Sequence, residues 1–205
     1  MIVIVDFGIG NLHSILHKLQ KIGMRAVVSS QASDIEKAEK LILPGVGAFA
    51  AGMQNLRDYG LIPILNHKVM VDKTPILGIC LGMQLFAKSS SEGNAAGLGW
   101  LEASVKRFDF NNLAPSPRIP HVGWNTIQPQ KVSLLFESVE TEQKFYFTHS
   151  YHLVSECNDI ILSTTQYGYP FISAVHQQNI YGVQFHPEKS HRRGLVIYKN
   201  FIEQV

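Results

Sequence analysis

The chain has 205 residues, of which 45% are hydrophobic and 17% charged, with a formal net charge of +2 at pH 7. This length suits one core, and the near balance of 18 basic and 16 acidic residues argues against an electrostatic nucleic-acid binder. Only two cysteines are present, which fits a reducing cytosol, and the apolar start is too short for a signal peptide or a membrane span. We therefore expect a single domain over residues 1–205 that is cytoplasmic and does not contact membranes.

The first 88 residues alternate short apolar runs with stretches of helical spacing. The apolar runs predict strands at 2–6, 26–29, 40–43 and 75–79. Helices are expected between these strands and over 81–88. This alternation predicts a parallel sheet with helices on its faces.

After residue 88 the pattern changes to a Ser- and Gly-rich loop over 89–99, followed by short runs separated by turn residues. Strands are expected at 101–108, 122–127, 144–154, 160–167, 171–176 and 180–186, and a final helix at 196–205. The expected fold class is α/β, with a mostly parallel central sheet flanked by helices and an additional antiparallel or mixed sheet in the C-terminal half.

The sequence around Cys80 has the form of a nucleophile elbow. Cys80 follows an apolar run and stands between Gly78 and Gly82, where an expected strand meets an expected helix. Side chains at the two glycine positions would collide with backbone, and the N–H groups that begin the helix favour a thiolate. We interpret Cys80 as a nucleophile; a buried structural cysteine is the alternative.

A candidate base lies more than a hundred residues further on, where an apolar strand runs into His186, Pro187 and Glu188. In an extended segment His186 and Glu188 project to the same side, and Pro187 stiffens the pair. A carboxylate beside an imidazole sets its tautomer and stabilises the imidazolium. Cys80, His186 and Glu188 therefore make a candidate nucleophile, base and orienting residue.

Acyl chemistry also needs donors for the oxyanion of the tetrahedral intermediate. The N–H of Leu81 lies on the elbow, and the loop 44–47, of sequence PGVG, offers further N–H groups at the end of a parallel strand. The glycines could instead hold a nucleotide phosphate, because Gly45, Gly47 and Ala50 match part of a dinucleotide fingerprint. However, no acidic residue follows at the distance that this fingerprint requires.

These motifs resemble, in order and spacing, those of class I glutamine amidotransferases. The matching segments are 44–47 (PGVG), 78–84 (GICLGMQ) and 184–188 (QFHPE). Three further segments are similar to the glutaminase subunits of imidazole glycerol phosphate synthases: 6–11 (DFGIGN), 120–125 (PHVGWN) and 145–151 (FYFTHSY). The resemblance covers the whole chain.

The resemblance implies a glutaminase in which Cys80 attacks the side-chain amide of L-glutamine, forms a thioester and releases ammonia. We expect no cofactor and no metal. The glutamine-binding residues it implies are Gly45, Gln84, His149, Ser150 and Tyr151, and the oxyanion-hole residues are Val46, Gly47 and Leu81.

The resemblance also implies a partner, a (β/α)8-barrel synthase subunit that receives the ammonia in a heterodimer. The barrel makes imidazole glycerol phosphate and an aminoimidazole carboxamide ribotide in histidine biosynthesis. The expected interface residues are Asn11, Pro120, His121, Gly123, Trp124 and Lys189. We expect low activity without the partner, because the glycine-rich loop 44–47 can adopt an inactive arrangement.

Several alternatives remain open from the sequence. Thr148 and His152 depart from the family pattern, so a paralogue that supplies ammonia to a sugar-aminating enzyme of surface polysaccharides is one alternative. A binding subunit with a latent triad and a cysteine peptidase are two others. His149 and His152 are three residues apart on an expected strand, which would point them to opposite faces and argues against a metal site. Trp124 suits a packing residue as well as an interface anchor.

Overall fold

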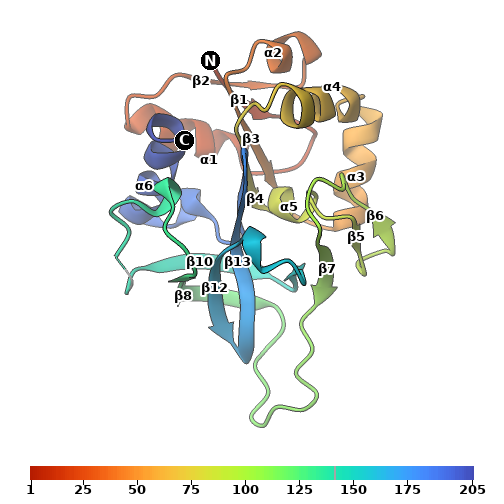
Figure 1. The fold of residues 1–205 in the computed structure, drawn as a ribbon, viewed down its shortest axis with the longest axis vertical. Coiled ribbons are helices and arrows are strands. Elements are labelled where there is room, and N and C mark those ends of the chain that lie inside the picture. The colour runs from red at the N-terminus through yellow and green to blue at the C-terminus, as the bar shows by residue number, and fades with distance from the viewer. Residues whose placement is uncertain (141) are drawn as a thin grey trace.

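The computed structural model describes residues 1–140 and 142–205. In this part of the chain the strands form one twelve-stranded sheet and one two-stranded sheet (Figure 1). The main path of the large sheet has the strand order β2-β1-β3-β4-β14-β13-β11-β7-β5-β6, while β12 pairs with β13 and β9 pairs with β12. The first half of this path is the parallel sheet that the alternating pattern predicts.

Five strands at one end of the large sheet run parallel to one another. They are β1 (Ile2–Val5), β2 (Ala26–Ser29), β3 (Lys40–Gly45), β4 (Ile76–Cys80) and β14 (Ile180–Val183). The helices connecting or following them are α1 (Leu12–Lys21), α2 (Ala32–Glu36), α3 (Phe49–Asp58), α4 (Ile62–Asn66), the π-helix η1 (His67–Val71) and α6 (His191–Glu203).

Two hydrophobic cores cover the two faces of this parallel sheet. Because side chains alternate along a strand, Ile4 of β1 faces the core that α1 and α6 complete, and Val3 faces the core that α2, α3 and α4 complete. Both cores are fully buried, which explains why these strands read as continuous apolar runs. Figure 1 shows α1 and α6 on one side of the sheet and α3 on the other.

The second half of the large sheet is mainly antiparallel. Its strands are β5 (Ser89–Ser90), β6 (Ala95–Ala96), β7 (Ser104–Arg107), β9 (Gln128–Pro129), β11 (Tyr151–Val154), β12 (Ile161–Tyr167) and β13 (Tyr169–Gln177). The small sheet pairs β8 (His121–Thr126) with β10 (Lys144–His149), and the 3-10 turns are η2 (Leu134–Phe136), η3 (Asn158–Ile160) and η4 (Pro187–Lys189). The predicted fold class is confirmed.

The structure corrects three expected elements. The strand expected over 144–154 is two strands in two sheets, because the chain bends at Ser150 without a glycine or proline to mark the break. The loop expected over 89–99 contains β5 and β6. The helix expected over 81–88 is only α5 (Leu81–Gln84), since the next carbonyls, those of Leu85 and Phe86, accept hydrogen bonds from Leu98 and Leu101 instead.

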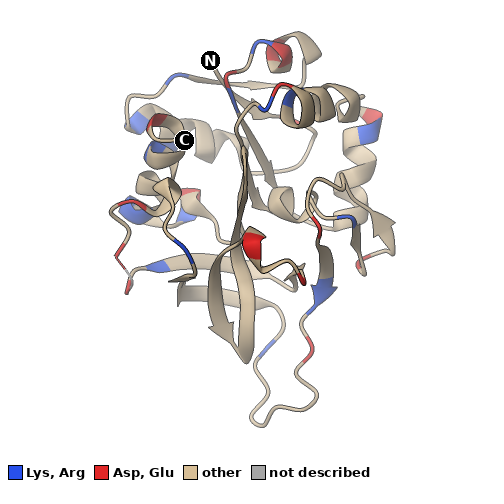
Figure 2. Ribbon diagram, viewed as in Figure 1, with Lys and Arg blue, Asp and Glu red and all other residues tan. Residues whose placement is uncertain are grey.

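The final helix also begins earlier than expected, at His191 rather than at residue 196. Its first turn is polar and contains Gly194, so this turn lacks the apolar spacing from which a helix is predicted. Charged residues of both signs are distributed over the helices and loops (Figure 2). Among the described residues, no helix has the length and apolar character needed to cross a membrane.

Candidate active site

Cys80 is the last residue of β4 and lies on the turn into α5. Its backbone has φ 54° and ψ −110°, values that non-glycine residues rarely adopt. A Cβ at Gly82 would overlap the carbonyl oxygen of Leu43, and one at Gly78 would lie 2.7 Å from the backbone nitrogen of Met83. The strained turn predicted around Cys80 is therefore present, and only glycine fits on either side of it.

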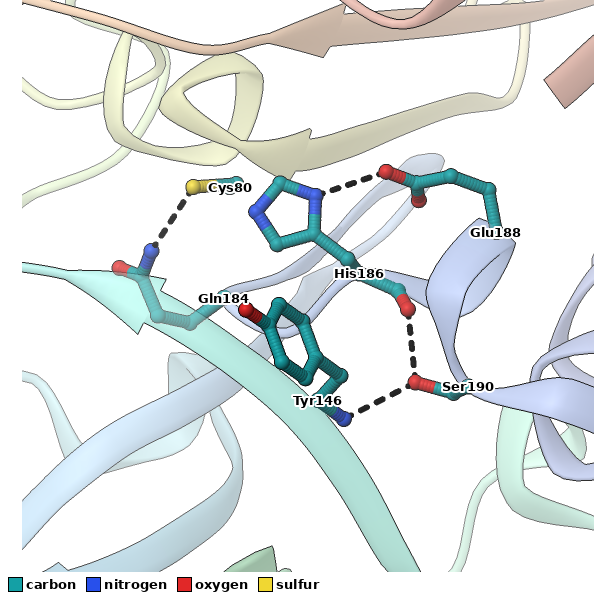
Figure 3. A network of polar contacts seen from close by, with 6 residues as sticks. All are labelled: Cys80, Tyr146, Gln184, His186, Glu188 and Ser190. Carbon is teal, nitrogen blue, oxygen red and sulfur yellow. Dashed lines mark hydrogen bonds and ion pairs between the residues drawn. The ribbon is translucent and has the colours of Figure 1, made fainter. Parts of the chain in front are cut away.

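His186 and Glu188 are joined by a buried hydrogen bond. His186 Nδ1 lies 2.8 Å from Glu188 Oε1, and the two side chains are 1% and 2% exposed (Figure 3). The expected contact is confirmed, but the expected extended backbone is wrong, because residues 187–189 form the 3-10 turn η4. The fixed φ of Pro187 suits a first helical turn as well as an extended chain, so sequence alone did not separate the two.

The other ring nitrogen of His186, Nε2, faces Cys80 (Figure 3) and has no hydrogen-bond partner among the described residues. Burial lowers the pKa of His186, but the negative charge of Cys80 and then the hydrogen bond and charge of Glu188 outweigh it and raise this pKa to about 10. An imidazolium beside a thiolate is the ion pair in which a cysteine is ready to attack a carbonyl.

Strand β10 holds His186 in place through backbone and hydroxyl contacts. The His186 N–H donates to the carbonyl of Tyr146 at 2.8 Å. Ser190 Oγ donates to the carbonyl of His186 at 2.6 Å and accepts from the N–H of Tyr146 at 3.0 Å (Figure 3). His186 is thereby fixed by both β10 and the turn before α6, and Ser190 itself is fully buried.

A cavity of about 320 Å³ adjoins Cys80. Gly45 does not line it, but Gly45 pairs directly with Cys80 in the ladder between β3 and β4, so the loop after Gly45 lies beside the sulfur. The lining residues are Val46, Gly47, Cys80, Leu81, Gln84, Glu92, Pro120, Thr148, His149, Ser150 and Tyr151. The structure thus brings together every other residue that the sequence assigns to glutamine binding or to the oxyanion hole.

The histidines beside this cavity are buried and neutral. His149 Nδ1 donates to the carbonyl of Tyr151 at 2.8 Å, so its Nε2 accepts from Nδ1 of His121 at 3.1 Å. Burial lowers the pKa of His149 to about 3 and that of His121 to about 4. Both are held as neutral hydrogen-bonding groups at physiological pH.

His149 and His152 do not point to opposite faces, which corrects the expectation from strand alternation. Both rings contact Phe108, with centroid distances of 5.2 Å and 4.6 Å. The bend at Ser150 between the two sheets breaks the alternation. His152 Nε2 is hydrogen-bonded to the hydroxyl of Tyr169, and no group of His, Cys, Asp or Glu in the described residues could hold a metal ion.

The expected interface residues are mostly on the surface. Trp124 is 42% exposed and stacks on His191 with a centroid distance of 5.1 Å, while Lys189 Nζ lies 5.4 Å from the Tyr146 ring. Asn11, Pro120 and Lys189 are exposed, and Gly123 is half-buried. His121 is the exception, because its side chain is only 3% exposed and lies against His149 behind the cavity rather than on a free surface.

Sequence reasoning gave no site role to Ser190 or Thr148, and it also missed Gln184 and Glu92. Gln184 donates to Cys80 Sγ, and Glu92 lines the cavity while its Oε2 accepts from the N–H of Phe49 at 2.8 Å. Gln184 stands within the apolar run before His186, and a buried amide requires partners, so its position was a usable signal. Glu92 lies in the Ser- and Gly-rich segment after Lys88, where nothing in the pattern distinguished it.

A strained cysteine, a buried histidine and a glutamate at the carboxyl ends of parallel strands are the groups that a thiol-dependent acyl transfer would need. The chain belongs to the class I glutamine amidotransferase family, because the family description "Glutamine amidotransferase class-I" matches residues 3–205.

Two curated relatives are similar over the full length of both chains. One, from Methanococcus maripaludis, is 48% identical over 204 residues, and one from Pseudomonas aeruginosa is 45% identical over 205 residues. Each alignment covers 100% of this chain and 100% of the relative, and both relatives are named imidazole glycerol phosphate synthase subunit HisH 2.

Solved structures of low sequence identity share the fold. A glutamine amidotransferase aligns with a TM-score of 0.72 at 21% identity, covering 98% of this chain and 97% of that chain. A glutamine amidotransferase from Thermotoga maritima aligns with a TM-score of 0.64 at 17% identity, covering 99% of this chain and 84% of that chain.

Proposed function

We propose that this chain is the glutaminase subunit of an imidazole glycerol phosphate synthase. It hydrolyses L-glutamine to glutamate and ammonia and passes the ammonia to a (β/α)8-barrel synthase subunit. The observation that best supports this function is the position of Cys80, which adjoins a polar cavity and faces the charged His186–Glu188 pair. The names of the two full-length relatives support the same assignment.

The first half of the reaction forms a thioester. The Cys80 thiolate attacks the side-chain amide carbon of glutamine, and the carbonyl oxygen becomes an oxyanion held by backbone N–H groups of Val46, Gly47 and Leu81. The C–N bond then breaks, and the leaving nitrogen takes the proton of the His186 imidazolium to become ammonia. The enzyme is left as a γ-glutamyl thioester with a neutral His186.

The second half hydrolyses the thioester. Neutral His186 removes a proton from water, the oxygen adds to the thioester carbon, and the same backbone donors hold the new oxyanion. The C–S bond breaks, glutamate leaves, and the thiolate–imidazolium pair is restored. Glu188 keeps Nδ1 of His186 hydrogen-bonded throughout, so Nε2 remains the nitrogen that carries the mobile proton.

The cavity suits a small amino acid. Glu92 is the acidic residue of the lining and complements an α-ammonium group, while Gln84 and residues 149–151 provide hydrogen-bonding groups. A volume of about 320 Å³ is at the low end of the range for ligand sites, which favours a single free amino acid over a peptide. This complementarity supports the glutaminase over a peptidase.

The partner would bind the surface that carries Trp124 and Lys189, with Asn11, Pro120 and Gly123 at its margins. Trp124 is a large exposed aromatic residue held flat against His191, which is the character of a binding hot spot. We propose a cytoplasmic location for the complex, which the presence of only two cysteines suits.

The decisive experiment measures glutamate release and ammonia transfer with and without the barrel subunit. We expect glutamate release that rises when the imidazole glycerol phosphate synthase barrel and its nucleotide substrate are added, and none from the Cys80→Ala variant. Transfer only to a sugar-aminating partner would favour the paralogous function. Glutamate release by Cys80→Ala at the wild-type rate would refute the glutaminase assignment.

A further inference from the structure

Gln184 is a fully buried residue between β14 and His186. Its side-chain Nε2 lies 3.5 Å from Cys80 Sγ, within the range of a hydrogen bond to sulfur (Figure 3). Its backbone N–H donates to the carbonyl of Ser173 at 2.9 Å, which ties the residue to β13. The reaction steps above assign Gln184 no role, although its side chain contacts the nucleophile.

Neighbouring groups fix the direction of the Gln184 amide. The carbonyl of Tyr151 only accepts, so it receives one N–H of Gln84 at 2.9 Å. The same Gln84 nitrogen lies 2.9 Å from Gln184 Oε1, which accepts its second N–H. The amide nitrogen of Gln184 must therefore face the sulfur, and the contact with Cys80 is a donor contact rather than an acceptor contact.

The chain of hydrogen bonds extends behind Tyr151. The Tyr151 carbonyl also accepts from His149 Nδ1, and His149 Nε2 accepts from His121. Burial keeps both histidines neutral, so neither ring gains a proton near neutral pH and the donor and acceptor of each hydrogen bond stay the same. The Tyr151 carbonyl thus accepts from both His149 and Gln84, which fixes the Gln84 amide, and Gln84 in turn directs the N–H of Gln184 at Cys80.

We propose that Gln184 is a positioning residue that holds Cys80 as a thiolate and directs its sulfur, with Gln84 setting the direction of the Gln184 amide. An amide supplies a donor without adding a net charge, so it stabilises the sulfur anion and leaves the proton of His186 available for transfer. Because the donor favours the anion over the neutral sulfur of the thioester, it also helps the sulfur to leave during hydrolysis. This role rests on the proposed function, since Gln184 acts on the same cysteine.

The test uses Gln184→Met, which keeps the shape and loses the donor, and Gln184→Glu, which keeps an acceptor for Gln84 and also loses the donor. The probe is iodoacetamide, used in a Cys157→Ser background because Cys157 is also a free cysteine, and its reaction with Cys80 needs no glutamine turnover. We expect the alkylation rate constant to fall about tenfold in Gln184→Met, as for loss of a hydrogen bond to a charged group, and further in Gln184→Glu, whose carboxylate also repels the thiolate. The loss should be largest at low pH and shrink as pH rises, because the donor favours thiolate over thiol.

Steady-state kinetics of the complex with the barrel subunit provide the second readout. We expect kcat to fall with little change in KM, together with a larger fraction of enzyme trapped as thioester in a quench. Asn200→Leu is the matched control, because Asn200 is a buried amide bonded to the carbonyls of Leu135 and Glu137, away from Cys80. It should lower the melting temperature and leave the alkylation rate unchanged.

The outcomes separate this role from the proposed function. Wild-type alkylation rates in both Gln184 variants overturn the role of Gln184, whatever the glutaminase assay gives. If the variants alkylate more slowly but every Cys80 is finally labelled, the role of Gln184 is supported. If instead the rate is normal and only part of the Cys80 is labelled, Gln184 serves folding alone and the proposed role is overturned. If the variants alkylate slowly but the wild-type protein does not turn over glutamine, the role of Gln184 at Cys80 stands and the glutaminase assignment is refuted.

Discussion

Gly45 and Cys80 are directly paired in the parallel ladder between β3 and β4. A Cβ at Gly45 would lie 3.1 Å from the backbone nitrogen of Gly82, so the end of β3 is packed tightly against the elbow. Cys80 and the start of the loop 46–47 are therefore positioned by one hydrogen-bonded ladder. Val46 and Gly47, which follow directly, are exposed and lie outside this ladder.

The first prediction concerns the charge on His186. Because Cys80 and then Glu188 raise its pKa above the ordinary value of 6.5 against the effect of burial, Cys80→Ala should lower that pKa. Because the pKa is higher in the folded chain, protonation of His186 contributes to stability. This contribution is fully present below pH 6.5 and is lost as the pH rises through about 10. NMR titration of the imidazole in both proteins measures the change, and an unaltered pKa in the variant would contradict it.

The second prediction concerns the elbow. Gly82→Ala should destabilise the fold by about 3 kcal/mol or more, because its Cβ would overlap the carbonyl oxygen of Leu43, and neither backbone segment can move without breaking the ladder. Chemical denaturation measures the loss. Ala51→Ser on the exposed face of α3 is the control and should cost about 0.5 kcal/mol. Wild-type stability of Gly82→Ala would show that the turn can relax.

The third prediction separates the oxyanion loop from folding. Gly47 has φ +104°, a conformation that L-residues rarely adopt, yet no atom lies within 4 Å of a Cβ built there. Gly47→Ala should therefore cost only about 1–3 kcal/mol of stability. Its peptide groups must rotate, and loss of one oxyanion donor lowers kcat by about 10²- to 10³-fold. Glutaminase kinetics of the complex test this, and an unchanged kcat would show that the loop does not contribute to the oxyanion hole.

The fourth prediction concerns recognition of the free amino acid. Glu92→Gln keeps an acceptor for the N–H of Phe49 but removes the negative charge from the cavity. We expect KM for glutamine to rise about tenfold or more with a smaller effect on kcat, because a hydrogen bond to a charged group contributes about 1.5–3 kcal/mol. If KM stays at the wild-type value, the α-ammonium group does not bind at Glu92.

The fifth prediction concerns the partner surface. Trp124→Ala should weaken binding of the barrel subunit by about 2–4 kcal/mol, the range for a central aromatic hot spot, without changing the melting temperature greatly. Isothermal titration calorimetry measures the affinity. Val132→Ala is the control, because Val132 is fully exposed and lies on a different segment. Equal affinities of the two variants would place the interface elsewhere.

The sequence predicted those features that depend on local rules. The parallel strands, the elbow at Cys80 and its glycines follow from apolar runs and from the steric demands of a sharp turn. The contact between His186 and Glu188 was also foreseen, although its backbone was not. These features need only neighbouring residues, which a single sequence displays.

The features that were missed depend on distant parts of the chain. The split at Ser150 is decided by pairing of the two halves with different strands, which residue preferences do not encode. The helix after Cys80 ends early because the segment 98–101 takes its carbonyls. The role of Gln184 required its distances to both Cys80 and Gln84, and the burial of His121 required its contact with His149.

The small sheet of β8 and β10 joins the two surfaces that we propose bind different ligands. Trp124 pairs with Tyr146 in its ladder, and His121 pairs with His149 at the end nearer the cavity. A protein bound at Trp124 and an amino acid bound beside His149 thus rest on the same pair of hydrogen-bonded strands. If either ligand shifts this ladder, thermodynamic reciprocity requires that glutamine strengthen partner binding by the factor by which the partner strengthens glutamine binding.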